Sequence, residues 1–523
     1  MRKDRPAFRN ALLAAEFGGI RHSVFTFAHF ACHRCVVLAS ALIFALAGCA
    51  APSARLSFPT SPTSTSESGR SFDVNGDGKP DWSIRAGVDG RLDTLEYDDD
   101  ENGTVDRRYS LSEYRTEEVP HLIILLDSIP FSAVADRYRE SGWTWFSPPQ
   151  KVIPPFPTLT EVAVTRMVGA PPNAGLINRY YDVAQGRTVD RLFQRASGGD
   201  LDPWERRLNY GLTFTQTGLA FLEPRPWFHS ELAAAKAAFN KSPDRVTIVY
   251  FASAACMVCK YGEEGVREVL DGLEQICLEI LWERRGAVKI SALADHGHNL
   301  IAGKRIDVPE MLKQAGFNPT DNLRSDRDVV VELDGLVNYA GIHTRHASEV
   351  ARVLTSTPEI QLAMYKEDNR IIVRDAHGAA AIEQRGDSYR YIVIDHDVLE
   401  YASVIAALAA AGKGDAEGFF ASADWFKATV DHHWPDAPVR IWEAFNIAAR
   451  NTPEVMMTTT QGYFVGLSSM EWFIKMASTH GGLDQVDSAT FMLTMTGRGQ
   501  HPMRTQDVLQ TIEPNYDPRF LRR

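Results

Sequence analysis

The stretch HLIILLD, residues 121–127, decides the fold class. A short apolar run that ends in a carboxylate is typical of a buried parallel strand with a polar group at its carboxyl end. Two similar runs follow, TIVYF at 247–251 and AVKISAL at 287–293, and apolar residues recur at helical spacing between them, over 266–281. We expect a loop between the second strand and this helix. The alternation predicts an α/β fold with a mostly parallel central sheet flanked by helices.

Length and charge set the outer limits. The chain has 523 residues, of which 44% are hydrophobic, so it can bury a large core in two or more domains, or in one large domain with appendages. Its formal charge of -12 argues against a broad nucleic-acid surface, and we expect no nucleic-acid partner.

The N-terminal region indicates export. VVLASALIFALA at 36–47 is too short to span a bilayer comfortably and leads into Leu46-Ala47-Gly48-Cys49. This ending resembles a bacterial lipobox, which implies that 1–49 is a lipoprotein signal peptide and Cys49 the lipidated residue; an ordinary signal peptide is the alternative. The Ser/Thr/Pro-rich stretch 50–70 then forms a tether. We therefore expect a lipid anchor on a membrane of the bacterial envelope, facing the periplasm or the outside.

Two Asp-rich stretches lie in the next region, 71–115. Each places oxygen-bearing side chains at alternate positions, followed by a glycine and a final aspartate, a pattern that suits calcium; an acidic solvated turn is the alternative. The eight candidate ligands are Asp73, Asn75, Asp77, Asp81, Asp98, Asp100, Asn102 and Asp106. We expect a structural role for this calcium.

We predict the main body over 116–500. Four motifs occur there in a defined order. They are the strand ending at Asp127, the stretch PFPTLT at 155–160, Asp295-His296-Gly297 and THGG at 479–482. Asp295 and His296 follow the third predicted strand, so they belong at the same sheet edge as Asp127. This order resembles the alkaline phosphatase superfamily, in particular its bacterial type I phosphodiesterase/nucleotide pyrophosphatase-like branch. The resemblance covers roughly residues 120–495.

The resemblance implies a metal-dependent hydrolase of phosphate esters. Asp127, Thr160, Asp295 and His296 would hold one divalent ion, and His480 would belong to a second. Independently of the family, a threonine hydroxyl needs a nearby cation to become a nucleophile at neutral pH. Asp and His ligands favour Zn²⁺, with Mn²⁺ and Ca²⁺ as alternatives. Thr160 is then the catalytic nucleophile, and the substrate is a small-molecule ester, a diester in preference to a monoester.

The chain departs from the family at the second metal. When Lys260-Tyr261-Gly262 is used as the anchor, the family's Asp and His fall on Ala255 and Cys259. Alanine cannot coordinate an ion, whereas Cys259, which follows Cys256 in a Cys-x-x-Cys arrangement, is a candidate ligand.

Three interpretations follow. The first is a one-metal hydrolase in which His480 and Lys260 act where the second ion would sit. In the second, Cys256, Cys259 and His480 rebuild an unusual zinc site. The third is an inactive binding protein with the same fold. A sulfate or phosphonate ester is an alternative substrate.

The rest of the chain gives structural signals. Three runs over 330–400 predict a small subsidiary β-rich element: 329–333, 370–374 and 389–394. Residues 501–523 are expected to form a C-terminal tail.

Overall fold

The computed structural model describes residues 53–114, 118–191, 194–195, 201–468, 470–472 and 476–517. The predicted signal peptide and Cys49 lie outside these residues. Within the described part of the chain, no helix has the length and apolar character needed to cross a membrane.

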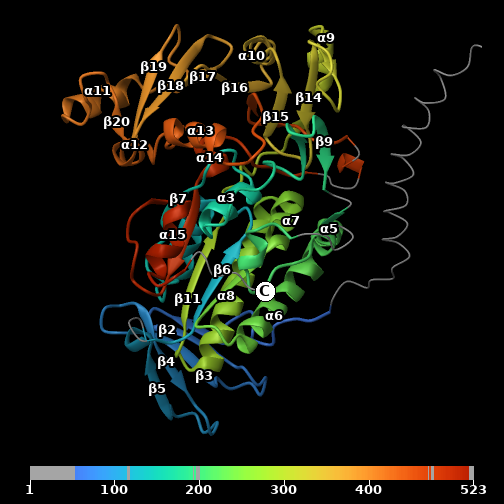
Figure 1. Cartoon of the computed structure of the whole chain (residues 1–523). Helices are drawn as coiled ribbons and strands as arrows, with labels where there is room; N and C mark the ends of the chain where they lie inside the picture. Colours follow the sequence, from blue (N-terminus) through green and yellow to red (C-terminus); the bar gives the residue numbers. More distant parts are fainter. Residues whose placement is uncertain are drawn as a thin grey trace, which may run out of the picture. The chain divides into compact units, whose positions relative to one another are not determined.

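A six-stranded mixed sheet forms the centre of the molecule (Figure 1). Strand β6 (His121–Leu126) lies between β10 (Val246–Phe251) and β11 (Lys289–Ala294), and both pairings are parallel. All three predicted core strands are thus present. The sheet continues through an antiparallel neighbour, in the order β23 (Thr490–Thr494), β7 (Gln150–Ile153) and β24 (Met503–Arg504).

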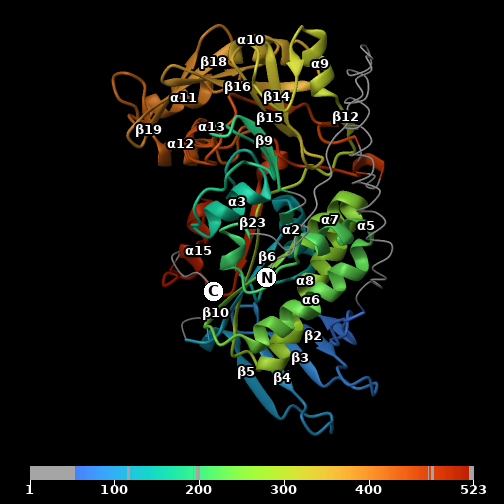
Figure 2. The same cartoon turned by 45° about the vertical axis from the view of Figure 1, so that its right-hand side comes forward.

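Helices cover both faces of this sheet, as the α/β prediction required. Leu122, Ile124 and Leu126 of β6 belong to the core that includes α8 (Glu263–Arg284). The alternate residues Ile123 and Leu125 belong to the core on the opposite face, with α3 (Thr160–Met167) and α15 (Thr505–Ile512). The first face also carries α2 (Phe131–Ser141), α5 (Phe214–Leu222), α6 (Pro224–Lys241) and α7 (Ala252–Tyr261), of which α5, α6 and α7 gather beside α8 in Figure 2.

The segment after β10 corrects one expectation. We expected a loop there, but α7 begins at Ala252, directly after the last residue of β10. Its N-terminus is held from outside, because Glu231 accepts hydrogen bonds from both the backbone N–H and the hydroxyl of Ser253. A distant carboxylate therefore caps a helix that has no local cap, a signal that local sequence does not carry.

The subsidiary β element is a nine-stranded sheet, larger than the three predicted runs suggest. Those runs correspond to β14 (Asp328–Glu332), β17 (Arg370–Arg374) and β19 (Ser388–Val393). The sheet order is β13 (Asn318–Pro319), β14, β15 (Tyr339–Thr344), β21 (Val455–Thr459), β16 (Ile360–Glu367), β17, β18 (Ala379–Arg385), β19 and β20 (Phe420–Ala421).

Helices also pack on this sheet. One core includes α9 (Val308–Gln314) and α10 (Ala347–Leu354), and the other includes α11 (Ala402–Ala410), α12 (Ser422–Thr429) and α13 (Ala437–Asn446). Other short elements are β8 (Arg179–Asp182) with β9 (Arg187–Asp190), β12 (Lys304–Arg305) with β22 (Tyr463–Phe464), and α14 (Gln485–Ser488). The C-terminal tail expected over 501–523 is wrong for 503–512, which form β24 and α15, because their apolar side chains are buried in the core on the second face of the central sheet.

The Asp-rich region forms a five-stranded antiparallel sheet: β1 (Ser64–Ser66), β2 (Gly69–Phe72), β3 (Trp82–Ala86), β4 (Leu92–Tyr97) and β5 (Arg107–Ser110). The tether expected over 50–70 is therefore wrong for 64–66 and 69–70, because these residues pair into the sheet. Trp82 and Tyr97 are buried in the same core as α8. The Tyr97 hydroxyl donates to the carbonyls of Leu281 and Trp282 at 3.2 and 3.0 Å. This sheet therefore packs firmly on the helical face.

Candidate metal centre

Asp127 lies one residue beyond β6, and the chain turns sharply after it. Ser128 adopts a left-handed backbone conformation with φ of 66°, which directs its N–H to Oδ1 of Asp295 at 3.1 Å. Asp127 itself accepts hydrogen bonds from the hydroxyls of Ser128 and Tyr250. The hydrogen bond from Ser128 to Asp295 thereby joins the carboxyl ends of β6 and β11, and the bond from Tyr250 to Asp127 joins β10 to the same edge.

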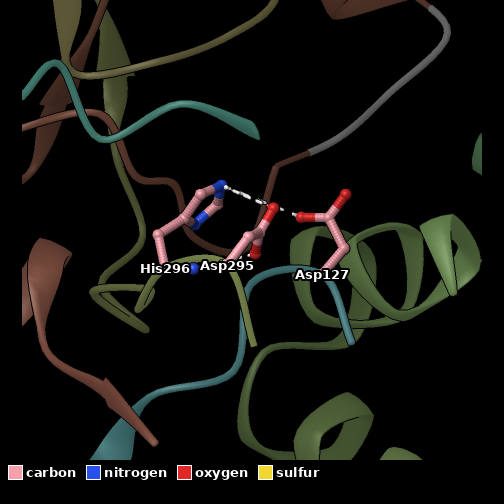
Figure 3. Close-up of side chains that lie close together, drawn as sticks. All are labelled: Asp127, Asp295 and His296. Atoms are coloured by element: carbon pink, nitrogen blue, oxygen red, sulfur yellow. Dashed lines mark hydrogen bonds and ion pairs between the residues drawn. The ribbon is translucent and has the colours of Figure 1, made fainter. Parts of the chain in front are cut away.

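Asp295 and His296 meet Asp127 at this edge (Figure 3). The Nε2 atom of His296 lies 3.5 Å from Oδ2 of Asp295 and 3.8 Å from Oδ1 of Asp127. All three residues are buried, and their candidate ligand atoms lie within 4.8 Å of one another. Gly297 is needed in this motif, because a Cβ there would lie 2.7 Å from the carbonyl of Ala489.

Thr160 completes the group from the opposite side. It is the first residue of α3, and its Oγ1 lies 3.3 Å from Nε2 of His296. The helix begins here with backbone N–H groups still free of intrahelical partners, which favours negative charge nearby. We call Asp127, Thr160, Asp295 and His296 the first metal position.

The donor set of the first metal position fits a divalent cation. The carbonyl of Gly297 can only accept, so Nδ1 of His296 donates to it at 3.0 Å and Nε2 keeps its lone pair. That lone pair faces two carboxylates, and Oδ2 of Asp295 has no hydrogen-bond partner among the described residues. Three electron-rich atoms pointed at one another in a buried pocket are unfavourable unless a cation lies between them.

Burial shifts the pKa values of these three residues so that each side chain favours its neutral form. It raises the pKa of Asp295 to about 7 and lowers the pKa of His296 to about 4. Burial, followed by the neighbouring Asp295 carboxylate, also raises the pKa of Asp127. Without a cation these carboxyls hold protons, and a metal ion would displace them.

His480 stands beside the first metal position. Its ring stacks on His296 with centroids 4.1 Å apart, and its Nδ1 donates to the carbonyl of Thr158 at 2.9 Å. Thr158 is fixed in turn, because the buried Arg440 guanidinium donates to its hydroxyl at 3.2 Å. The orientation leaves Nε2 of His480 as the atom available to a ligand.

The positions that the resemblance assigns to the other second-metal ligands carry apolar or weakly coordinating residues. Ala255 and Cys259 are buried on α7, and both line one cavity with His480. Burial raises the pKa of Cys259, so its sulfur is a neutral thiol at neutral pH. Ala255, Cys259 and His480 form what we call the second metal position.

Two other side chains named from the sequence do not complete this position. Cys256 is directed elsewhere, with its thiol near the carbonyls of Thr217 and Ala252. The Lys260 ammonium donates to the carbonyl of Leu222 at 2.6 Å, and Lys260 is absent from the cavity lining among the described residues.

The cavity has a volume of about 610 Å³, and Thr160 and Asp127 are among its lining residues. Its walls include residues that the sequence motifs did not single out, among them Glu161, Asn178, Tyr250 and Asp334. Of these residues, only Glu161 had a sequence signal for the site, because it directly follows Thr160. The remainder come from separate strands and loops that the fold assembles.

The two Asp-rich loops have the same local structure. Asp73 accepts from the N–H groups of Gly76, Asp77 and Gly78, and Asp98 accepts from those of Asn102 and Gly103. At the end of each loop, Asp81 and Asp106 each accept from the backbone N–H groups seven and six residues before them. Asp98, Asp100 and Asp106 also bring carboxylate oxygens within 4.8 Å of one another.

Comparisons with known proteins return structural likenesses only. No family model and no curated protein matches the chain. Among solved structures, the chain is similar to phosphonoacetate hydrolase from Sinorhizobium meliloti 1021 in complex with phosphonoformate, at 12% identity and a TM-score of 0.42, over 79% of this chain and 98% of that one. It is also similar to murine ectonucleotide pyrophosphatase/phosphodiesterase 5, at 11% identity and a TM-score of 0.41, over 74% and 92%. Likenesses of this size assign no activity to the chain.

Proposed function

We propose that this protein is a metal-dependent hydrolase of phosphate esters in the alkaline phosphatase superfamily, with a preference for diesters. The observation that carries the proposal is the convergence of Thr160 Oγ1, two buried carboxylates and a neutral imidazole nitrogen at one point. These groups come from three separate parts of the chain, which a chance polar turn does not explain.

The chain's own residues have distinct roles in this proposal. Asp127, Asp295 and His296 would hold one ion, with Zn²⁺ as the expected metal and Mn²⁺ or Ca²⁺ as alternatives. A divalent ion bound there would lower the pKa of the neighbouring hydroxyl. The Thr160 hydroxyl releases its proton to solvent as Oγ1 attacks phosphorus, the bond from phosphorus to the departing ester oxygen breaks, and the departing alkoxide takes a proton from water. A water molecule then hydrolyses the phosphothreonine and restores the hydroxyl.

The second metal position supports a one-metal enzyme. His480 keeps a nitrogen available, while Ala255 offers no ligand and Cys259 is a buried thiol. His480 would then face the transferred group as a neutral side chain whose Nε2 accepts a hydrogen bond, for example from a water molecule, since burial holds its pKa well below the usual range.

The experiment is hydrolysis of bis(4-nitrophenyl) phosphate by the full chain with Zn²⁺, Mn²⁺ or Ca²⁺. Thr160→Ala should reduce the rate at least about a thousandfold, because it removes the nucleophile, while the ion still binds to the remaining three ligands. Thr188→Ala, on β9 and away from the cavity lining, is the matched control and should keep the rate.

The alternatives have clear signatures in the same assay. A bound ion without turnover of any phosphate, sulfate or phosphonate ester would identify an inactive binding protein. Turnover of a nitrophenyl sulfate or phosphonate ester in preference to the phosphate would identify the other ester class.

We further propose that Cys49 carries a lipid that anchors the chain in the bacterial envelope, and that the Asp-rich loops bind structural calcium. The lipobox-like Leu46-Ala47-Gly48-Cys49 supports the first, and mass spectrometry of Cys49 tests it. The repeated loop geometry supports the second.

A further inference from the structure

The cavity beyond Thr160 has two unlike walls. One is apolar and aromatic and comes from residues 201–221, with Trp204, Leu208, Tyr210, Leu212, Phe214 and Phe221. The other is polar and consists of Glu161, Asn178, Glu332 and Asp334, which we call the acidic lobe. Glu161 directly follows the proposed nucleophile, so the acidic lobe begins where the reacting phosphorus would lie.

The cations around the cavity do not neutralise the acidic lobe. Among the described lining residues, Arg195 is the one lysine or arginine, and its guanidinium is bonded to Asp202 and Glu205. Glu332 has its own partner in the buried His343, whose Nε2 lies 3.0 Å from Oε1.

Glu161 and Asp334 have no ion pair within the described part of the chain, and both accept hydrogen bonds from Asn178. Asn178 donates from its side chain to Oε1 of Glu161 at 3.3 Å and from its backbone N–H to Oδ2 of Asp334 at 3.2 Å. The lobe therefore carries two carboxyl groups without a close ion pair, on which Arg195 and Arg179 act only at longer range. Among the described residues, these carboxyls belong to no group of three or more His, Cys, Asp or Glu side chains at metal-ligand spacing, which favours an organic cation over a metal ion.

Two buried acceptors of the acidic lobe lack a hydrogen-bond partner within the described part of the chain. Asn178 is 8% exposed, and its Oδ1 has no hydrogen-bond partner among the described residues; the same holds for Oε2 of Glu332, which is 2% exposed. Buried acceptors are almost always bonded in folded proteins. Since both atoms can only accept, the missing partner is a donor such as an N–H group.

We propose that the acidic lobe binds an alkylammonium group on the ester substrate. The inference rests on the proposed function for the position of the phosphorus and deepens it by naming the substrate class: a phosphodiester in which one alcohol carries a primary ammonium. The carboxylates offset the positive charge, the unpartnered acceptors take its N–H donors, and the aromatic wall covers the alkyl chain. A substrate with a second anionic group in place of the ammonium would be disfavoured. That group would lie beside Glu161 and Asp334, and the one arginine among the described lining residues is already bonded to other carboxylates.

The test is calorimetric binding of phosphoethanolamine and propyl phosphate, in which a methyl group replaces the ammonium, to the Zn²⁺-loaded full chain. The expected preference for phosphoethanolamine is about tenfold or more, the size of a charge-assisted hydrogen bond. Asp334→Asn should reduce this ratio to below about threefold. Asp431→Asn, which removes an exposed carboxylate paired with Lys151, is the control and should keep the ratio.

Equal binding of the two ligands by the unmodified protein, or an unchanged ratio in Asp334→Asn, would overturn the inference. If Asp334→Asn fails to fold, as near-ultraviolet circular dichroism would show, Glu161→Gln gives the second variant. Hydrolysis of the 4-nitrophenyl esters of the same two phosphates separates the claims. A binding preference without turnover contradicts the proposed function alone, and turnover without a preference contradicts the acidic lobe alone.

Discussion

The first and second metal positions lie side by side, joined by the stacked rings of His296 and His480, yet they are built from opposite kinds of residue. The first gathers two carboxylates, an imidazole nitrogen and a hydroxyl in a buried space. The second offers His480 beside a methyl group and a neutral thiol.

The difference shows which half of the centre requires an ion. Electron-rich atoms that face one another without a cation are costly when buried, so the first metal position is stable only with protons or a metal. The second carries no such cost, because Ala255 and Cys259 pack as apolar side chains. We therefore expect one ion per chain.

The largest effect that tests this contrast is the pH dependence of metal affinity. The Asp295 carboxyl, with a pKa raised to about 7, holds a proton below that pH and must release it for the metal. Zn²⁺ affinity should therefore fall by about tenfold between pH 8 and pH 6 from Asp295 alone, and further through Asp127. Competition with a fluorescent chelator at each pH measures this.

Asp295→Asn is the control for that measurement. It should bind Zn²⁺ at least about a hundredfold more weakly and with a flatter pH dependence, since it lacks the titrating ligand. An affinity that stays constant from pH 8 to pH 6 in the unmodified protein would contradict the assignment of the carboxylates as ligands.

A smaller effect is expected from rebuilding the second metal position. Ala255→Asp combined with Cys259→His places two ligands four residues apart on α7, facing the cavity with His480. The double variant should bind two equivalents of Zn²⁺, and Cys259→Ser alone should keep one; mass spectrometry under native conditions counts them. Loss of bound zinc in Cys259→Ser would instead favour a rebuilt cysteine site.

The smallest effect concerns the Asp-rich loops, whose carboxylates are mostly solvent-exposed. Millimolar Ca²⁺ should raise the unfolding temperature by a few degrees, because it binds only the folded loops. Asp98→Asn should remove about half of that rise without changing turnover. Equal stabilisation of Asp98→Asn and the unmodified protein would show that the loops are solvated turns.

The sequence predicted the parts of the fold that depend on local pattern. The apolar runs at 121–126, 247–251 and 287–293 gave the three parallel strands, and their polar ends placed Asp127 next to Asp295. The segment after 251 was wrongly expected to be a loop, because the cap of α7 comes from the distant Glu231.

The cavity walls depend on contacts between distant residues, which no local pattern encodes. Asn178 and Asp334 are 156 residues apart yet hydrogen-bonded, and His343 balances Glu332 from the next strand of the nine-stranded sheet. Most of that sheet was missed for the same reason, since its strands are short and their pairing is set by tertiary packing.

The most direct test of a single metal-activated threonine is zinc-edge anomalous diffraction from crystals of the full chain. We expect one zinc peak about 2.0–2.2 Å from ligand atoms of Asp127, Asp295 and His296, with Thr160 Oγ1 beside it. A peak held by Cys259 and His480, or no peak among these carboxylates, would contradict it.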